Sequence, residues 1–129
     1  MMRIAIAALL VVAGVIHVLP LSGVLGAGRL AALYGLSLDD ADLVLLLRHR
    51  AVLFGLLGAL RLYAAWDPAY QPIAVGVGLV SAVSFLVLAR ARGRGDATSN
   101  AAIQRVVRAD IVAVLALALA AALVVYREA

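Results

Sequence analysis

The sequence predicts an all-α fold: an integral membrane four-helix bundle with a short interfacial helix between its first two spans. Hydrophobic residues make up 67% of the 129 residues and charged residues only 14%, whereas soluble domains average about 45–50% apolar and about 25% charged residues. Four apolar segments have roughly the 17–25 residues that a helix needs to cross a bilayer: 4–25, 43–65, 73–89 and 106–126. We therefore expect one transmembrane domain that comprises residues 1–129.

The first apolar segment, 4–25, also has features of a cleaved signal peptide, since Arg3 precedes it and small residues follow it. It is longer than the about 7–15 apolar residues of a signal-peptide core, so we expect a span. In the following connection, GRLAALYG predicts a short interfacial helix that ends at Gly35. SLDD then predicts that the second spanning helix begins near Leu38, with Ser37 as its cap and Asp40 as the capping-box partner.

The other two connections differ in character. WDPAYQP predicts a tight turn, because each of its two prolines disfavours helix in the residue before it. RARGRGDATSN is polar and broken by glycines, so it predicts a loop after the third span. At its end Thr98, Ser99 or Asn100 is expected to cap the fourth spanning helix.

Four spans place both chain ends and the second connection on one face of the membrane, and the other two connections on the opposite face. Three of the eleven arginines, Arg3, Arg61 and Arg127, belong to the first face, and the other eight belong to the second. The positive-inside rule therefore predicts extracytoplasmic termini, although Arg3 by itself favours the reverse. An interfacial aromatic belt is predicted at the first face, formed by Tyr63, Trp66, Tyr70 and Tyr126.

A polar layer is predicted in the cytoplasmic half of the bundle and is the candidate ligand-binding site: His17, Arg48, His49, Arg50 and Asp110. Residues 48–50 spread over about 200° of a helix, so their side chains cannot share one direction. The two histidines lie at similar depth, roughly 9–12 Å from the membrane surface.

Asp110 is the only carboxylate in the fourth span, and we expect it to pair with Arg48 or Arg50. Arg105 and Arg108 are expected to turn towards lipid phosphates.

Several function classes are excluded. Because the chain has no cysteine, it has no disulfide, thiolate metal site or thiol nucleophile. Its arginines lie in or beside apolar runs, and no basic face studded with aromatic residues predicts a nucleic-acid partner. No zincin motif, phosphate-binding loop or nucleophile elbow is present. Asp39, Asp40 and Asp42 are interpreted as an acidic first helical turn, so no metal site is expected.

The lipid bilayer is the expected partner of such a chain. Three functions remain open for it. The leading hypothesis is a non-enzymatic protein that binds a small amphipathic or anionic ligand in the polar layer, or an accessory or structural subunit of a homo-oligomer or larger membrane complex. The alternative is a redox protein in which His17 and His49, with the flanking arginines, hold haem b or a quinone. A third is a lipid-modifying enzyme with His49 as general base.

Four stretches resemble a group of small bacterial proteins with four transmembrane helices and unknown function: GVIHVLPLSGVLGAGRLAALYGL, LLLRHRAVLFGLLG, QPIAVGVGLVSAVSFL and RVVRADIVAV. The resemblance covers almost the whole chain, with RHRAVLFG as its most specific part, and implies a multi-pass protein of the bacterial inner membrane. Members are often labelled phosphopantetheine adenylyltransferases. The T/HxGH motif of the soluble adenylyltransferases is absent here, so we do not expect that activity. A looser likeness, in architecture, is to DoxX-like membrane proteins, some of which are linked to quinone-coupled oxidation.

Overall fold

The computed structural model describes residues 1–91 and 100–129, and within these residues it is all-helical, without strands. Its α-helices are α1 (Met2–Val18), α2 (Ala27–Tyr34), α3 (Ala41–Trp66), α4 (Gln71–Ala91) and α5 (Ala101–Glu128). Two 3₁₀ helices connect them, η1 (Leu19–Leu25) and η2 (Pro68–Tyr70). Most of the loop that RARGRGDATSN predicts, including the candidate caps Thr98 and Ser99, lies outside the described residues.

Four helical segments are long and apolar enough to cross a membrane: Met2–Leu25, Ala41–Trp66, Pro68–Ala91 and Ala101–Arg127. Each contains one of the four segments expected from the sequence, apart from small differences at the ends. Their outward faces carry large exposed aliphatic side chains, such as Leu45, Val80 and Leu115. Exposed apolar surface on this scale is typical of helices that contact lipid.

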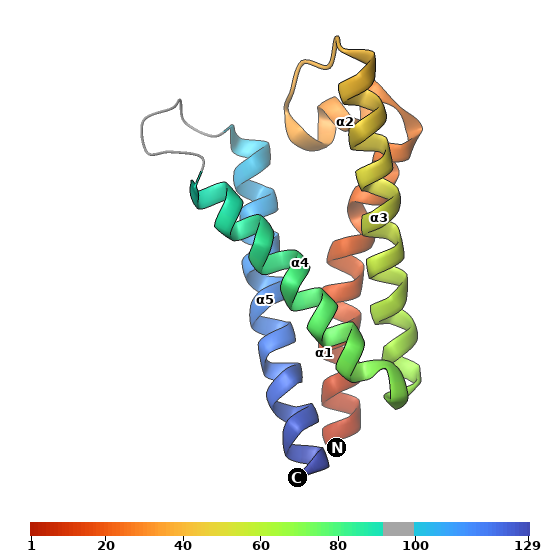
Figure 1. Cartoon of the computed structure of the whole chain (residues 1–129), viewed down its shortest axis with the longest axis vertical. Helices are drawn as coiled ribbons and strands as arrows, with labels where there is room; N and C mark the ends of the chain where they lie inside the picture. The colour runs from red at the N-terminus through yellow and green to blue at the C-terminus, as the bar shows by residue number, and fades with distance from the viewer. Residues whose placement is uncertain (92–99) are drawn as a thin grey trace.

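The ends of the bundle are arranged as the sequence predicts. Both termini and the η2 turn lie at one end, and α2 lies at the other (Figure 1). The four aromatic residues of the predicted belt belong to the terminal end and are exposed, and the rings of Tyr63 and Tyr70 pack edge to face with 5.2 Å between their centroids. Which end faces the cytoplasm stays a prediction.

Short polar side chains and glycine define the helix ends near α2. Helix α2 ends at Gly35, whose φ of 63° is in the left-handed region, as predicted. Helix α5 is capped by Asn100, whose Oδ1 accepts from the backbone N–H of Ile103 at 2.8 Å. The Nδ2 of the same side chain donates to the carbonyls of Tyr34 and Gly35 at 2.9 and 3.1 Å. One residue therefore joins the start of α5 to the end of α2.

The predicted start of α3 is wrong by three residues. The helix begins at Ala41, and its cap is Asp40, whose Oδ1 accepts from the backbone N–H groups of Asp42 and Leu43 at 2.8 and 3.1 Å. The predicted cap, Ser37, instead donates its hydroxyl proton to Asp39 at 2.7 Å. A carboxylate is the stronger acceptor at the positive end of a helix, which explains why Asp40 takes this position.

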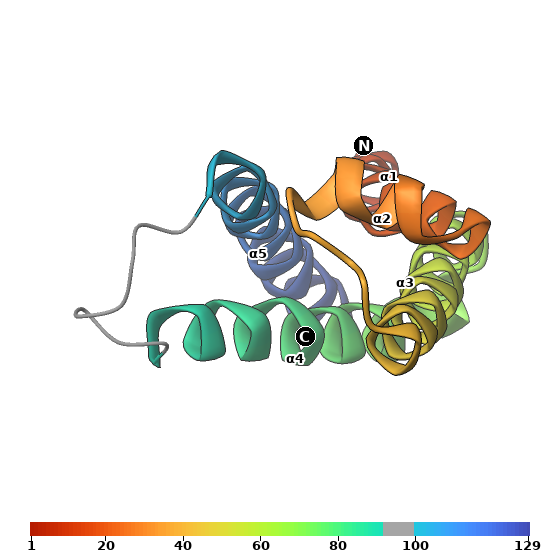
Figure 2. The same ribbon diagram turned by 90° about the horizontal axis from the view of Figure 1, so that it is seen from above.

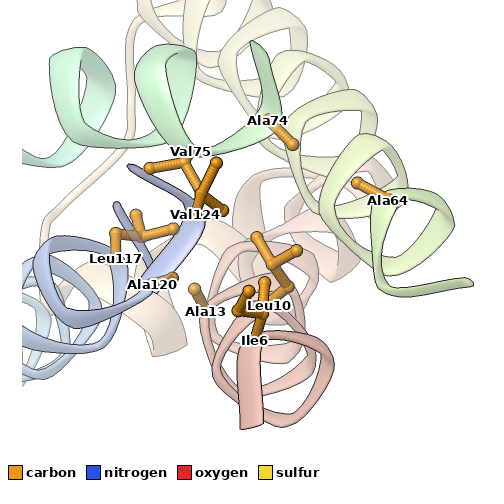
Figure 3. Packing of buried hydrophobic residues seen from close by; sticks show 9 residues of the cluster. All are labelled: Ile6, Leu10, Ala13, Ala64, Ala74, Val75, Leu117, Ala120 and Val124. Atoms are coloured by element: carbon orange, nitrogen blue, oxygen red, sulfur yellow. The ribbon is translucent and has the colours of Figure 1, made fainter. Parts of the chain in front are cut away.

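Small residues let the helices approach closely in the half of the bundle near the termini. The hydrophobic core there is shared by α1, α3, α4 and α5 (Figure 3): Ile6, Leu10, Ala13, Ala64, Ala74, Val75, Leu117, Ala120 and Val124. Helices α1 and α3 cross at Gly14 and Gly58, where a Cβ on Gly58 would lie 2.9 Å from the carbonyl oxygen of Gly14. Beyond η2, α4 leaves α3 and runs beside α5, so the bundle widens towards the α2 end (Figures 1 and 2).

Candidate functional site

A cavity of about 250 Å³ lies in the wide half of the bundle, between α1, η1, α2, α3 and α5. We call it the polar pocket. Most of its wall is aliphatic, but charged or imidazole side chains from three helices reach it: His17, Arg50, Arg105 and Asp110. Three of the five residues of the predicted polar layer, His17, Arg50 and Asp110, therefore line a common space.

His17 belongs to α1 and is only 1% exposed. Its Nδ1 lies 2.9 Å from the carbonyl oxygen of Ala13, one helical turn earlier. Since a carbonyl only accepts hydrogen bonds, Nδ1 carries the proton, and in the neutral ring Nε2 keeps its lone pair. This Nε2 is buried and has no hydrogen-bond partner among the described residues. His17 therefore lines the pocket and carries a buried acceptor that no described residue uses.

Arg50 is held on α3 by aromatic rings from three helices. Its guanidinium carbon lies 4.8 Å from the ring centroid of Phe54, 5.5 Å from that of Phe85 on α4 and 5.6 Å from that of Tyr34 on α2. Such cation–π contacts are worth about 0.5–2 kcal/mol each and orient the cation without occupying its N–H donors. Arg50 therefore lies fixed at the pocket, and within residues 1–91 and 100–129 its N–H groups form no hydrogen bond that would compete with an anion.

Asp110 is the buried acid of the site, 6% exposed on α5. The cations that act on it most strongly are Arg50 and Arg61. Within the described residues no ion pair closer than 4.0 Å joins it to an arginine. The expected direct pair with Arg48 or Arg50 is therefore not found, although Arg50 exerts a longer-range attraction.

Arg48 and His49 point away from the polar pocket. The Nε of Arg48 donates to the carbonyl of Val24 at 2.9 Å, so Arg48 holds the end of η1 against α3. His49 is exposed and does not line the pocket, so the two histidines of the predicted haem site do not share it. The cause is the 100° step between successive helical residues: only Arg50 of the triplet faces the pocket.

Arg61 is the residue that the sequence analysis missed. The sequence places Arg61 near the terminal face of the membrane. In the structure its side chain is 1% exposed, and its Nε and both Nη atoms are buried without an acceptor in the described part of the chain. The guanidinium packs on Gly78 of α4, where a Cβ would lie 2.7 Å from Nε and 2.8 Å from Nη2. A signal existed in the sequence: Arg61 continues the helix stripe of Arg50, Phe54 and Leu57.

Arg105 also differs from expectation. It was expected to turn towards lipid phosphates, but it lines the polar pocket as an exposed residue of the rim. Ala102 and Ala109 of α5 line the polar pocket together with Arg105.

Comparison with known proteins does not assign this chain to a family. No protein-family model, no curated protein and no solved structure matches the chain. In the described part of the chain no three metal-binding side chains gather in one place. The functional argument therefore rests on the polar pocket itself.

Proposed function

We propose that this chain is a multi-pass membrane protein whose polar pocket binds, without transforming it, an amphiphile that has a single negative charge on its headgroup. The observation that carries the proposal is the charge of the pocket lining. Arg50 and Arg105 supply two positive charges and Asp110 one negative charge, in a wall that is otherwise mostly aliphatic. The net charge of +1 matches a monoanion.

The surroundings strengthen the attraction for an anion. Charges interact several times more strongly beside low-dielectric walls than in water, where about 1 kcal/mol is typical at 4 Å. Guanidinium groups suit carboxylates and phosphates, because their N–H donors form paired, charge-assisted hydrogen bonds. The aromatic rings around Arg50 hold its guanidinium in place before a ligand arrives, which lowers the entropy cost of binding.

The apolar part of the ligand follows from the walls. Ile16, Leu19, Leu33 and Val106 line the pocket, so a headgroup bound there lies among apolar side chains and not in bulk water. The spanning helices also expose large aliphatic side chains, which supports a bilayer as the source of the ligand. An amphiphile with an acidic headgroup satisfies both requirements.

A quinol is the second candidate, supported by the buried Nε2 of His17. A quinol hydroxyl would donate to this lone pair, and its second oxygen would accept from Arg50. The geometry supports haem b less, because His49 is exposed and leaves His17 without a second axial imidazole.

The test compares three probes with the same alkyl chain: dodecanoate, dodecyl phosphate as its monoanionic methyl diester, and dodecanol. Each is equilibrated with the protein in phosphatidylcholine nanodiscs, and binding is taken as the excess over protein-free nanodiscs. We expect saturable binding of one or both anions, and at least tenfold weaker binding of dodecanol, since a charge-assisted hydrogen bond is worth about 1.5–3 kcal/mol. Dodecanoate and dodecyl phosphate separate a carboxylate ligand from a phosphate ligand.

Two arginine variants supply a matched control. Arg50→Gln removes the cation that faces the pocket, and we expect it to weaken anion binding tenfold or more. Arg48→Gln removes the cation two residues earlier, which bonds to Val24 outside the pocket, and we expect a change of less than twofold. Equal binding of dodecanol and the anions, or equal effects of the two variants, would refute the proposal. A soluble quinol that displaces the anion from wild type but not from His17→Phe would instead support the second candidate.

A further inference from the structure

A second cavity lies on the other side of Arg50, between α3 and α4. It has a volume of about 470 Å³ and is open to the outside of the bundle, and we call it the α3–α4 groove. Its lining residues on α3 and α4 belong to the part of the bundle where these two helices have diverged, and Figure 1 shows this divergence beyond η2. Most of its lining comes from one stripe of α4, which includes Ser81, Ser84, Phe85 and Leu88.

Arg50 and Phe54 line both the polar pocket and the α3–α4 groove. The aromatic contacts of Arg50 also involve both cavities, since Tyr34 belongs to the pocket wall and Phe85 to the groove wall. The two cavities therefore meet at a partition formed by one cation and one ring, both on α3.

Among the described residues, the single charged group that lines the groove is again Arg50. The hydroxyl of Ser84 is not a free donor, because it donates its proton to the backbone carbonyl of Ser81 at 2.9 Å. The remaining lining is apolar: Phe54, Phe85, Leu88, Ala89 and Ile103. Such a groove suits an alkyl chain whose charged end reaches Arg50.

We infer that the α3–α4 groove is the channel through which the alkyl chain of the anionic amphiphile reaches the site from the bilayer, with its acidic headgroup bound at the Arg50–Phe54 partition. The inference rests on the proposed function and names the route and the position of the chain. Arg50 lies nine residues beyond the start of α3, about 13 Å along the helix. The headgroup is therefore drawn well below the level of ordinary lipid headgroups, while the chain stays beside lipid.

Fluorescence quenching by dibrominated stearate tests where the alkyl chain lies. Trp66 is the only tryptophan, is exposed and lies outside the groove. The Trp66→Phe protein therefore has no tryptophan fluorescence of its own. In that background Phe85→Trp places the reporter in the groove wall and keeps an aromatic ring beside Arg50. Val83→Trp is the matched control: it lies two residues away on α4, about 160° around the helix axis, and does not line the groove.

In phosphatidylcholine nanodiscs we expect saturable quenching of the Phe85→Trp protein, reversed by excess dodecanoate. The Val83→Trp protein should show only the weak, non-saturating quenching of a probe dissolved in the bilayer. Equal, non-saturating quenching of both proteins, with dodecanoate binding intact, would overturn the route through the groove and leave the proposed function standing. Loss of dodecanoate binding by wild type would overturn the proposed function itself.

A second pair of variants tests the route without a reporter. Ser84→Phe fills the groove from an exposed position and should weaken dodecanoate binding tenfold or more. Val83→Phe adds the same ring on the opposite side of α4 and should change binding by less than twofold. If Ser84→Phe leaves both the affinity and the rate of dodecanoate binding unchanged, the chain does not pass through this groove.

Discussion

The contact between Gly78 and Arg61 makes a sharp prediction about stability. In Gly78→Ala the new methyl group would lie 2.7 Å from Nε and 2.8 Å from Nη2 of Arg61, and 2.8 Å from Cδ1 of Leu117. Both Arg61 and Leu117 are fully buried, so neither has open space to move into. Overpacking of this kind costs about 1–3 kcal/mol, while the better helix propensity of alanine returns about 0.8–1 kcal/mol.

Gly76, two residues earlier on α4, is the control. A Cβ there meets nothing within 4 Å, so Gly76→Ala should gain the propensity term alone. The predicted difference in unfolding free energy between the two variants is therefore about 1–3 kcal/mol. Unfolding in mixed micelles with increasing SDS, followed by circular dichroism, measures this difference.

A double variant identifies the cause. If the guanidinium is what the methyl group meets, Arg61→Met should recover most of the loss caused by Gly78→Ala, because a flexible thioether replaces the rigid planar group. If Gly78→Ala proves as stable as Gly76→Ala, or if Arg61→Met fails to reduce the difference, Arg61 does not lie on Gly78 and the described core is incorrect.

Three further variants follow from the same structure. Gly58→Ala should cost about 3 kcal/mol or more, since its methyl group meets the backbone of Gly14 on α1, which cannot rotate away; a loss below that caused by Gly78→Ala would contradict this packing. Asn100→Ala removes a helix cap and two hydrogen bonds to α2, so we expect the unfolding free energy to fall by about 1–3 kcal/mol in the same SDS assay. The control Ser37→Ala changes an exposed side chain and should lower it by less than 0.5 kcal/mol. Arg61→Met alone should raise stability by about 1–4 kcal/mol, because it removes a buried cation that has no hydrogen-bond acceptor among the described residues. A loss of stability would instead show that the cation is compensated in the bundle.

The buried charges of the bundle are few and unevenly compensated. Arg61 and Asp110 attract each other, but no ion pair within 4.0 Å joins them in the described residues. Burial of a charge costs several kcal/mol unless hydrogen bonds or an opposite charge offset it. A polar layer that is only partly satisfied is common at functional sites, and here it lies directly beside the polar pocket.

Features that depend on neighbouring residues along the chain could be predicted from the sequence. Length and apolar composition determined the four helices that are long and apolar enough to cross a membrane, because a bilayer-spanning segment needs a certain run of apolar residues whatever it packs against. Gly35 was predicted in its capping position, and Asn100 was one of three candidate caps, for the same reason: a left-handed residue and a side-chain acceptor act on the backbone one turn away. The similar depth of His17 and His49 was inferred by counting residues along each helix and stays a prediction.

The direction in which a long side chain points was decided by the tertiary structure. His17 and His49 were expected at the same depth, yet one is buried beside the polar pocket and the other is exposed, since only contact between helices determines which side of each helix faces inwards. Arg61 could be placed along α3 from the sequence, but its burial depends on Gly78 of α4 lying opposite it. The divergence of α4 from α3 is likewise a property of helix packing, and it creates the groove on one side of Arg50 while α1, α2 and α5 enclose the pocket on the other.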